Sequence, residues 1–229
     1  MKIKKHIFIL IILFLSFSCD TAKQTNDFTE GEITYEISYL QNNLENIETS
    51  LLPKKMTLTF NSNCSLTKID GFMGLFSISL ISDFSNSKDI TMVKFFDNKY
   101  VHYCDKNEES SIFEYMNIKN IKTNNQTTVD YLGFDAKTAQ VFEKGLEPYN
   151  IYFTDEIGVS NPNRNNPFRD VNGVLLEFQL QLLQLRMNLT AKKVEQKTVT
   201  NDEFTVPDEY TTVSRESIIL ILNKMLETS

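Results

Sequence analysis

The stretch GVLLEFQLQLLQLRMNLTAKKV, residues 173–194, decides the fold because two secondary structures compete for it. Its leucines are typical of a helix, but its apolar residues alternate with polar ones in two runs, and a period of two indicates strands. The phase changes by one residue at Leu182-Leu183. A two-residue turn there pairs Phe178 with Met187 and gives one apolar and one polar face. A wider turn, or one long strand with a bulge, also fits.

Similar alternation predicts more strands along the chain. They cover residues 31–41, 54–60, 64–70, 72–84, 90–97, 99–105, 127–145 (with a bend near Gly133) and 149–157. Predicted two-residue turns at 70–71 and 97–98 and a loop at 83–88 join them into an antiparallel meander of at least five strands. We therefore expect a mainly β (α+β) fold.

Helical spacing of apolar residues predicts short helices at 43–52 and 109–117 and a closing helix from Ser214, the expected N-cap. Residues 158–172 are rich in Asn and contain two prolines, so we expect a loop. Long loops often carry function. Arg164 and Arg169 in this loop are candidates for contact with a head group or a partner.

The N-terminus predicts a targeting segment at residues 1–18. Three lysines precede an apolar run, Ile7 to Leu15, which as a helix extends only about 14 Å and cannot span a bilayer. The run ends in LSFSC, which resembles the lipobox of bacterial lipoproteins. The resemblance implies cleavage before Cys19 and lipidation of Cys19. Residues 19–30 are then a lipidated flexible tether, and residues 31–229 a single β domain.

Charge excludes one class of partner. Removing residues 1–18 takes away three lysines and no acids, so the net charge changes from −7 to −10 over the remaining 211 residues. Nucleic-acid binding requires a basic surface, so we expect no nucleic-acid partner. The predicted acyl chains, rather than charge, would hold the protein at a membrane.

Catalytic and metal-binding motifs are missing from the sequence. His102 is the only histidine after the signal segment, and no glycine-rich phosphate loop or nucleophile elbow is present. His102 and Cys104 share one face of a strand but have no further ligand cluster, and Asp155 and Glu156 point to opposite faces. We expect no catalytic residue, no metal and no cofactor.

The two remaining cysteines are not expected to form a disulfide. The predicted turns set Cys64 opposite Ser77 and place Cys104 three strands away. Their Cα atoms are then on the order of 15 Å apart, whereas a bridge needs less than about 7 Å.

Several segments together resemble one family. EGEITYEI, LLPKKMTLTF, DYLGFDAKTAQVF, NGVLLEFQLQ and FTVPDEY resemble motifs of the GLPGLI-like and related uncharacterised envelope lipoproteins, which are similar to LolA-like and LppX-like half-barrels. Ala136 stands where the family has a cysteine, which removes any role for that cysteine. The resemblance implies a curved antiparallel sheet that forms an incomplete β-barrel with short helices. LolA-like members carry acyl chains in the concave face, and the GLPGLI-like families have no assigned activity.

These observations favour a non-enzymatic, lipid-anchored protein of the cell envelope. We expect an outer-membrane lipoprotein that faces the periplasm or the cell surface. The first hypothesis is a module that binds an apolar or lipid ligand in the concave face of the sheet. The residues expected to contact that ligand are Leu176, Phe178, Leu180, Leu185, Met187 and Leu189. The second is a structural or assembly partner of an envelope protein complex, with no small-molecule ligand.

Overall fold

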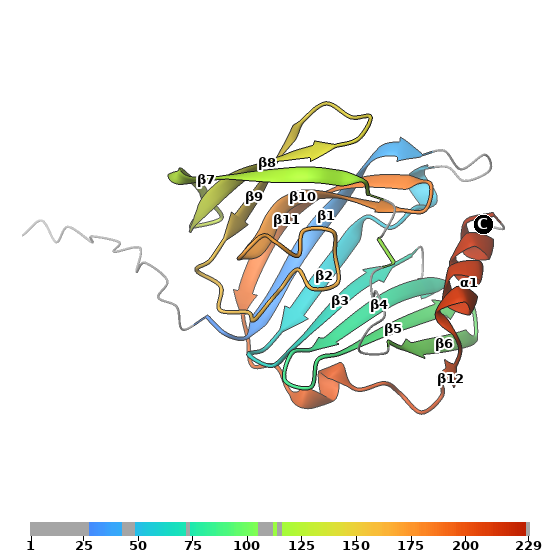
Figure 1. The fold of residues 1–229 in the computed structure, drawn as a ribbon. Coiled ribbons are helices and arrows are strands. Elements are labelled where there is room, and N and C mark those ends of the chain that lie inside the picture. The colour runs from blue at the N-terminus through green and yellow to red at the C-terminus, as the bar shows by residue number, and fades with distance from the viewer. Residues whose placement is uncertain (1–27, 43–48, 72–73, 105–111, 114–115, 228–229) are drawn as a thin grey trace, which may run out of the picture.

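One curved sheet forms the fold, as the computed structural model of the chain shows (Figure 1), and 12 of its strands lie in the residues that the structure describes. The structure describes residues 28–42, 49–71, 74–104, 112–113 and 116–227. The strands are β1 (Gly31–Asn42), β2 (Lys55–Phe60), β3 (Cys64–Asp70), β4 (Phe76–Asp83), β5 (Lys88–Phe95), β6 (Asn98–Tyr103), β7 (Ile118–Tyr131), β8 (Phe134–Glu143), β9 (Tyr149–Thr154), β10 (Val174–Leu182), β11 (Leu185–Gln196) and β12 (Thr211–Thr212).

The sheet is open, with β12 and β7 at its two edges. The strand order is β12-β6-β5-β4-β3-β2-β1-β11-β10-β9-β8-β7, and every pair is antiparallel except β12 with β6. The mainly β fold, the curved sheet that does not close into a barrel and the helix at the C-terminus are confirmed. The predicted anchor at Cys19 lies outside the described residues.

The decisive stretch folds as the β10–β11 hairpin. Leu182 pairs with Leu185, and Phe178 pairs with Leu189 rather than with Met187. The predicted strands and the separation of apolar from polar faces are confirmed, but the predicted register is wrong by two residues. The turn is Leu183-Gln184, and Leu183 adopts a positive φ of 52°. A shift in register of two residues returns each side chain to the same face, so the side chains lie on the predicted side of the sheet despite the error.

Two other predicted turns are displaced. Cys64 pairs with Asp83, not with Ser77, because Asp70 pairs with Ser77 and no two-residue turn forms at 70–71. The β5–β6 turn is Phe96-Asp97, so Phe95 pairs with Asn98. The loop between Asp83 and Lys88 is confirmed. Cys64 and Cys104 form no disulfide, as predicted.

The helices are few and short. Helix α1 (Arg215–Glu227) begins as predicted after Ser214, whose Oγ accepts the backbone N–H of Ser217 at 3.3 Å. Of the helix expected at 43–52, a 3-10 turn η1 (Thr49–Leu51) is present, and residues 43–48 lie outside the described part. The helix expected at 109–117 falls mostly outside it too. A second 3-10 turn, η3 (Asn201–Phe204), follows β11.

The main core cluster lies on the concave side of the sheet, and a smaller cluster of Ile81, Met92, Val101, Val199 and Phe204 lies on its other face. Helix α1 buries Ile218, Leu222 and Met225 against one end of this side, while the connection between β9 and β10 crosses the middle (Figure 1). Five consecutive apolar residues, 218–222, give α1 more apolar surface than the sheet covers, and Leu220 is 61% exposed. The core is therefore closed by segments of the chain itself.

Candidate functional site: a covered sheet face and an open edge

The six residues predicted to contact a ligand lie on the core face of β10 and β11. Leu176, Phe178, Leu180, Leu185, Met187 and Leu189 are all buried, at most 4% exposed. Five belong to the main core cluster, and Leu185 packs with Leu52 beside it. The structure thus brings the predicted residues together, but under other parts of the chain rather than on an open concave surface.

The connection between β9 and β10, residues 155–173, covers this face. Phe168 and Val171 of the connection are buried in the core, and the Phe168 ring meets the Phe178 ring edge-on at 6.1 Å between centroids. The buried Asn163 side chain donates to the carbonyl oxygens of Val171 (2.7 Å) and Gly173 (2.9 Å). Sequence analysis predicted this loop but not that its aromatic residue fills the face it crosses.

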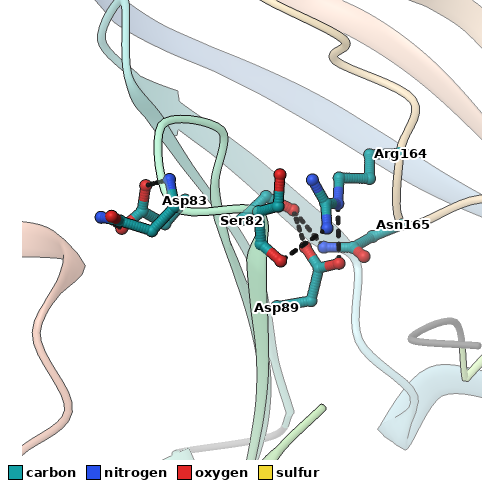
Figure 2. Close-up of polar contacts among 7 residues, drawn as sticks. Ser82, Asp83, Asp89, Arg164 and Asn165 are labelled. Atoms are coloured by element: carbon teal, nitrogen blue, oxygen red, sulfur yellow. Dashed lines mark hydrogen bonds and ion pairs between the residues drawn. The ribbon is translucent and has the colours of Figure 1, made fainter. Parts of the chain in front are cut away.

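Polar contacts fasten the same connection to the β4–β5 hairpin, as Figure 2 shows. Arg164 Nε donates to Asp89 Oδ2 at 2.7 Å, and its Nη2 donates to the Ser87 carbonyl at 3.0 Å. Asp89 also accepts the Ser82 hydroxyl at 2.9 Å, and Asn165 Nδ2 donates to that hydroxyl oxygen. The Asp89 side chain is only 8% exposed, so the Arg164 guanidinium neutralises a largely buried carboxylate. Arg164, a predicted contact residue, therefore binds the protein's own hairpin.

Little space remains beneath the cover. A cavity of about 40 Å³ there is lined by residues such as Tyr35, Leu80 and Phe178, and another cavity beside α1 is about 20 Å³. A water molecule needs roughly 10–15 Å³ by this measure, and ligand pockets usually hold about 300–1,000 Å³. An acyl chain on this face requires the connection to move, so binding there stays a prediction.

A larger space lies outside the core, between β7 and the connection. This groove has a volume of about 420 Å³. Its lining residues are Ile118, Lys119, Asn120, Ile121, Thr123, Pro167, Arg169 and Asp170. Arg169, which the sequence analysis singled out, lines the groove, whereas Arg164 does not. The groove is open to solvent, and it is lined by two cations (Lys119 and Arg169), the carboxylate of Asp170 and two half-buried isoleucines.

Strand β7, one wall of the groove, is the outermost strand of the sheet. It pairs with β8 on one side, and no described strand pairs with its other side. Its register with β8 is unbroken from Asn120 to Asn124, between shifts at 118–120 and 124–128. An edge strand presents unpaired backbone N–H and C=O groups to a further strand. At the opposite edge, β12 and the chain leading to α1 lie beside β6.

The first half of β7 was not predicted, because its residues are mostly polar and the predicted strand began at residue 127. The register shift also hides the alternation: Ile118 pairs with Glu143 and Asn120 with Phe142, which leaves Lys119 without a partner in β8. Ile121 and Thr123, two residues apart, were the available signal. Their period-two spacing continues the strand toward its N-terminal end.

The residues weighed for chemistry have structural partners. The His102 ring Nδ1 lies 3.1 Å from the Val213 carbonyl oxygen, Asp155 pairs with Lys137, and Glu156 Oε2 accepts the backbone N–H of Asp135. Within the described residues, no three His, Cys, Asp or Glu side chains are grouped to hold a metal ion. The expectation of a non-enzymatic protein stays a prediction.

Comparisons with known proteins support the fold alone. No protein-family model and no curated protein matches the sequence. Two structures of PNGF-II, in the P21 and C2 space groups, match with a TM-score of 0.53 each and 13% and 14% identity. They cover 86% and 87% of this chain, which spans only about a third (34% and 33%) of PNGF-II. Membership of the GLPGLI-like families stays a prediction. No helix among the described residues has the length and apolarity needed to cross a membrane.

Proposed function

We propose that the protein is a non-enzymatic binding module of the cell envelope that holds an extended segment of a protein partner along β7. The observation that carries the proposal is the combination of an outermost strand and a 420 Å³ groove along it. Proteins that recognise peptides by strand addition use such an edge for backbone hydrogen bonds and an adjacent groove for alternate side chains. The proposed envelope location and lipid anchor rest on the predicted signal segment and Cys19.

The regular part of β7 sets the size of the ligand. Residues 120–124 extend over about 17 Å, which matches a partner strand of about five residues. Each new backbone hydrogen bond contributes about 0.5–1.5 kcal/mol net, so the side chains in the groove must supply the selectivity. The bulged second half of the strand, beyond Asn124, is a poor template for pairing.

A peptide screen on the full chain in detergent tests this function. We expect some ten-residue peptides to bind, and binding to be lost when alternate backbone nitrogens of these peptides are methylated. Ile121→Asp, in the groove wall, should weaken binding, whereas Leu132→Asp, at the exposed tip of the same hairpin, should not. The proposal is wrong if no peptide binds. It is also wrong if the methylated peptides bind the wild type normally and the Ile121→Asp variant binds the unmodified peptides normally.

The apolar face gives a second candidate function, the binding of an apolar or lipid ligand after the connection 155–173 opens. It is supported by the apolar residues of β10 and β11 beneath a long connection that lacks secondary structure. Asn165 and Ser82 are in contact, so the variant Ser82→Cys/Asn165→Cys should form a disulfide that locks the cover. Fatty-acid binding that is present when the disulfide is reduced and absent when it is oxidised would support this function. Equal binding in both states would contradict it.

A further inference from the structure

The groove beside β7 contains charges that the protein leaves available. Lys119 and Arg169 line it from opposite walls, together with the carboxylate of Asp170. None of the three forms an ion pair within the described residues. Three other lysines, Lys99, Lys137 and Lys197, each pair with an acidic side chain. The groove therefore combines two unpaired cations with one unpaired anion.

The backbone of β7 explains why Lys119 lines the groove. The register shift between Ile118 and Asn120 makes Lys119 an extra residue without a partner in β8. Lys119, Ile121 and Thr123 alternate along the strand, so their side chains share one face, and all three line the groove. Lys122, three residues later, instead lies over the Phe142 ring, 4.9 Å from its centroid, and does not line the groove. Lys119 thus lines the groove, whereas Lys122, on the other face of the strand, packs on the sheet.

We propose that the segment held along β7 carries an acidic side chain that contacts Lys119 and Arg169, with an apolar side chain two residues away against Ile121. This inference rests on the proposed function and specifies its ligand. Alternate residues of an added strand face the same side, which sets the two-residue spacing. The chain as a whole is acidic, with a net charge of −7, so this local excess of cations selects the ligand at contact rather than attracting it from a distance.

The test compares two forms of one peptide, chosen from those that bind the full chain, with either Glu or Gln at the acidic position. We expect the wild type to bind the Glu form about three to ten times more tightly, as measured by fluorescence anisotropy. The variant Lys119→Gln/Arg169→Gln should lose this preference. The control Lys122→Gln, which removes one positive charge from the same strand outside the groove, should keep it, and Lys119→Gln alone is the variant of equal charge with which it is compared.

The outcomes separate the inference from the proposed function. If the wild type binds the Glu and Gln peptides equally, or if the double variant keeps the preference for Glu, the inference is wrong. Strand addition itself is not contradicted by either result. Displacement of the Glu peptide by an equal concentration of inorganic phosphate shows a free-anion site and also overturns it. If peptides of neither form bind, the proposed function fails, and the inference fails with it.

Discussion

Replacing Arg186 should destabilise the fold more than any surface substitution, because Arg186 neutralises a buried acid. Arg186 of β11 and Glu143 of β8 form an ion pair whose side chains are only 4% and 6% exposed. The guanidinium donates to both oxygens of Glu143, at 3.1 and 2.8 Å, and twice to Gln179 Oε1, at 3.0 and 2.9 Å. It also stacks on the Tyr149 ring, with 5.3 Å between Cζ and the centroid.

The variant Arg186→Met keeps the aliphatic stem but removes all four hydrogen bonds. Among the described residues, Glu143 then keeps the Tyr149 hydroxyl, at 3.3 Å, as its one side-chain donor. Removing one partner of a buried ion pair costs about 3–5 kcal/mol of unfolding free energy. For a chain of this size, that corresponds to a melting temperature lower by roughly 6–20 °C.

Urea unfolding at pH 7 measures this cost, and the double variant Arg186→Met/Glu143→Gln isolates its cause. Gln removes the unpaired charge, so the double variant should be about 1–3 kcal/mol more stable than Arg186→Met alone. A loss below about 1 kcal/mol, or a double variant no more stable than the single one, would refute the reasoning.

Three further outcomes are expected. Arg164→Ala leaves Asp89 without its cation, so it should lower the unfolding free energy in urea by about 1–3 kcal/mol and speed proteolysis within residues 155–173. Arg169→Ala should change neither the unfolding free energy nor the proteolysis rate. Equal effects of the two variants would contradict the contacts assigned to Arg164. Burial raises the pKa of the Tyr35 hydroxyl far above its usual value of 10. The contribution of Tyr35 to stability is therefore fully present below pH 10 and is lost above it at about 1.4 kcal/mol per pH unit. Tyr35→Phe should reduce the slope of stability against pH by about this amount, and an unchanged slope would contradict the expectation. Cys19→Ala should release the protein from membranes. If the variant stays in the membrane fraction and the wild type incorporates no labelled fatty acid, the anchor is excluded.

The faces of the sheet could be predicted from sequence because alternation records which side of a strand is buried. Gln179 and Arg186, which a helix would have turned toward the apolar side, lie together on the polar face of the β10–β11 hairpin. Register was less predictable, because three hairpin turns place Phe96, Leu132 and Leu183 at positive φ, where Gly or Asn is usual. At residue 71 the expected tight turn is replaced by a wider one that closes with a Gly71 N–H bond to the Phe76 carbonyl (2.9 Å).

The candidate site was harder to predict because it depends on contacts across the whole chain. The loop 158–172 was evident from its composition, but only packing shows that Phe168 enters the core and that Arg164 reaches Asp89, 75 residues away in sequence. The groove joins Arg169 to the start of β7, which a polar sequence and a bulge concealed. Alternation detects buried faces, and an exposed edge strand has too little burial to produce it.

Hydrogen exchange at β7 tests the central claim most directly. The amides of residues 120–124 should be compared in the full chain with and without a saturating peptide that binds it. Strand addition predicts slower exchange at alternate amides of this segment and no change in β12, at the opposite edge of the sheet. Bound peptide with unchanged exchange along β7 would contradict the account.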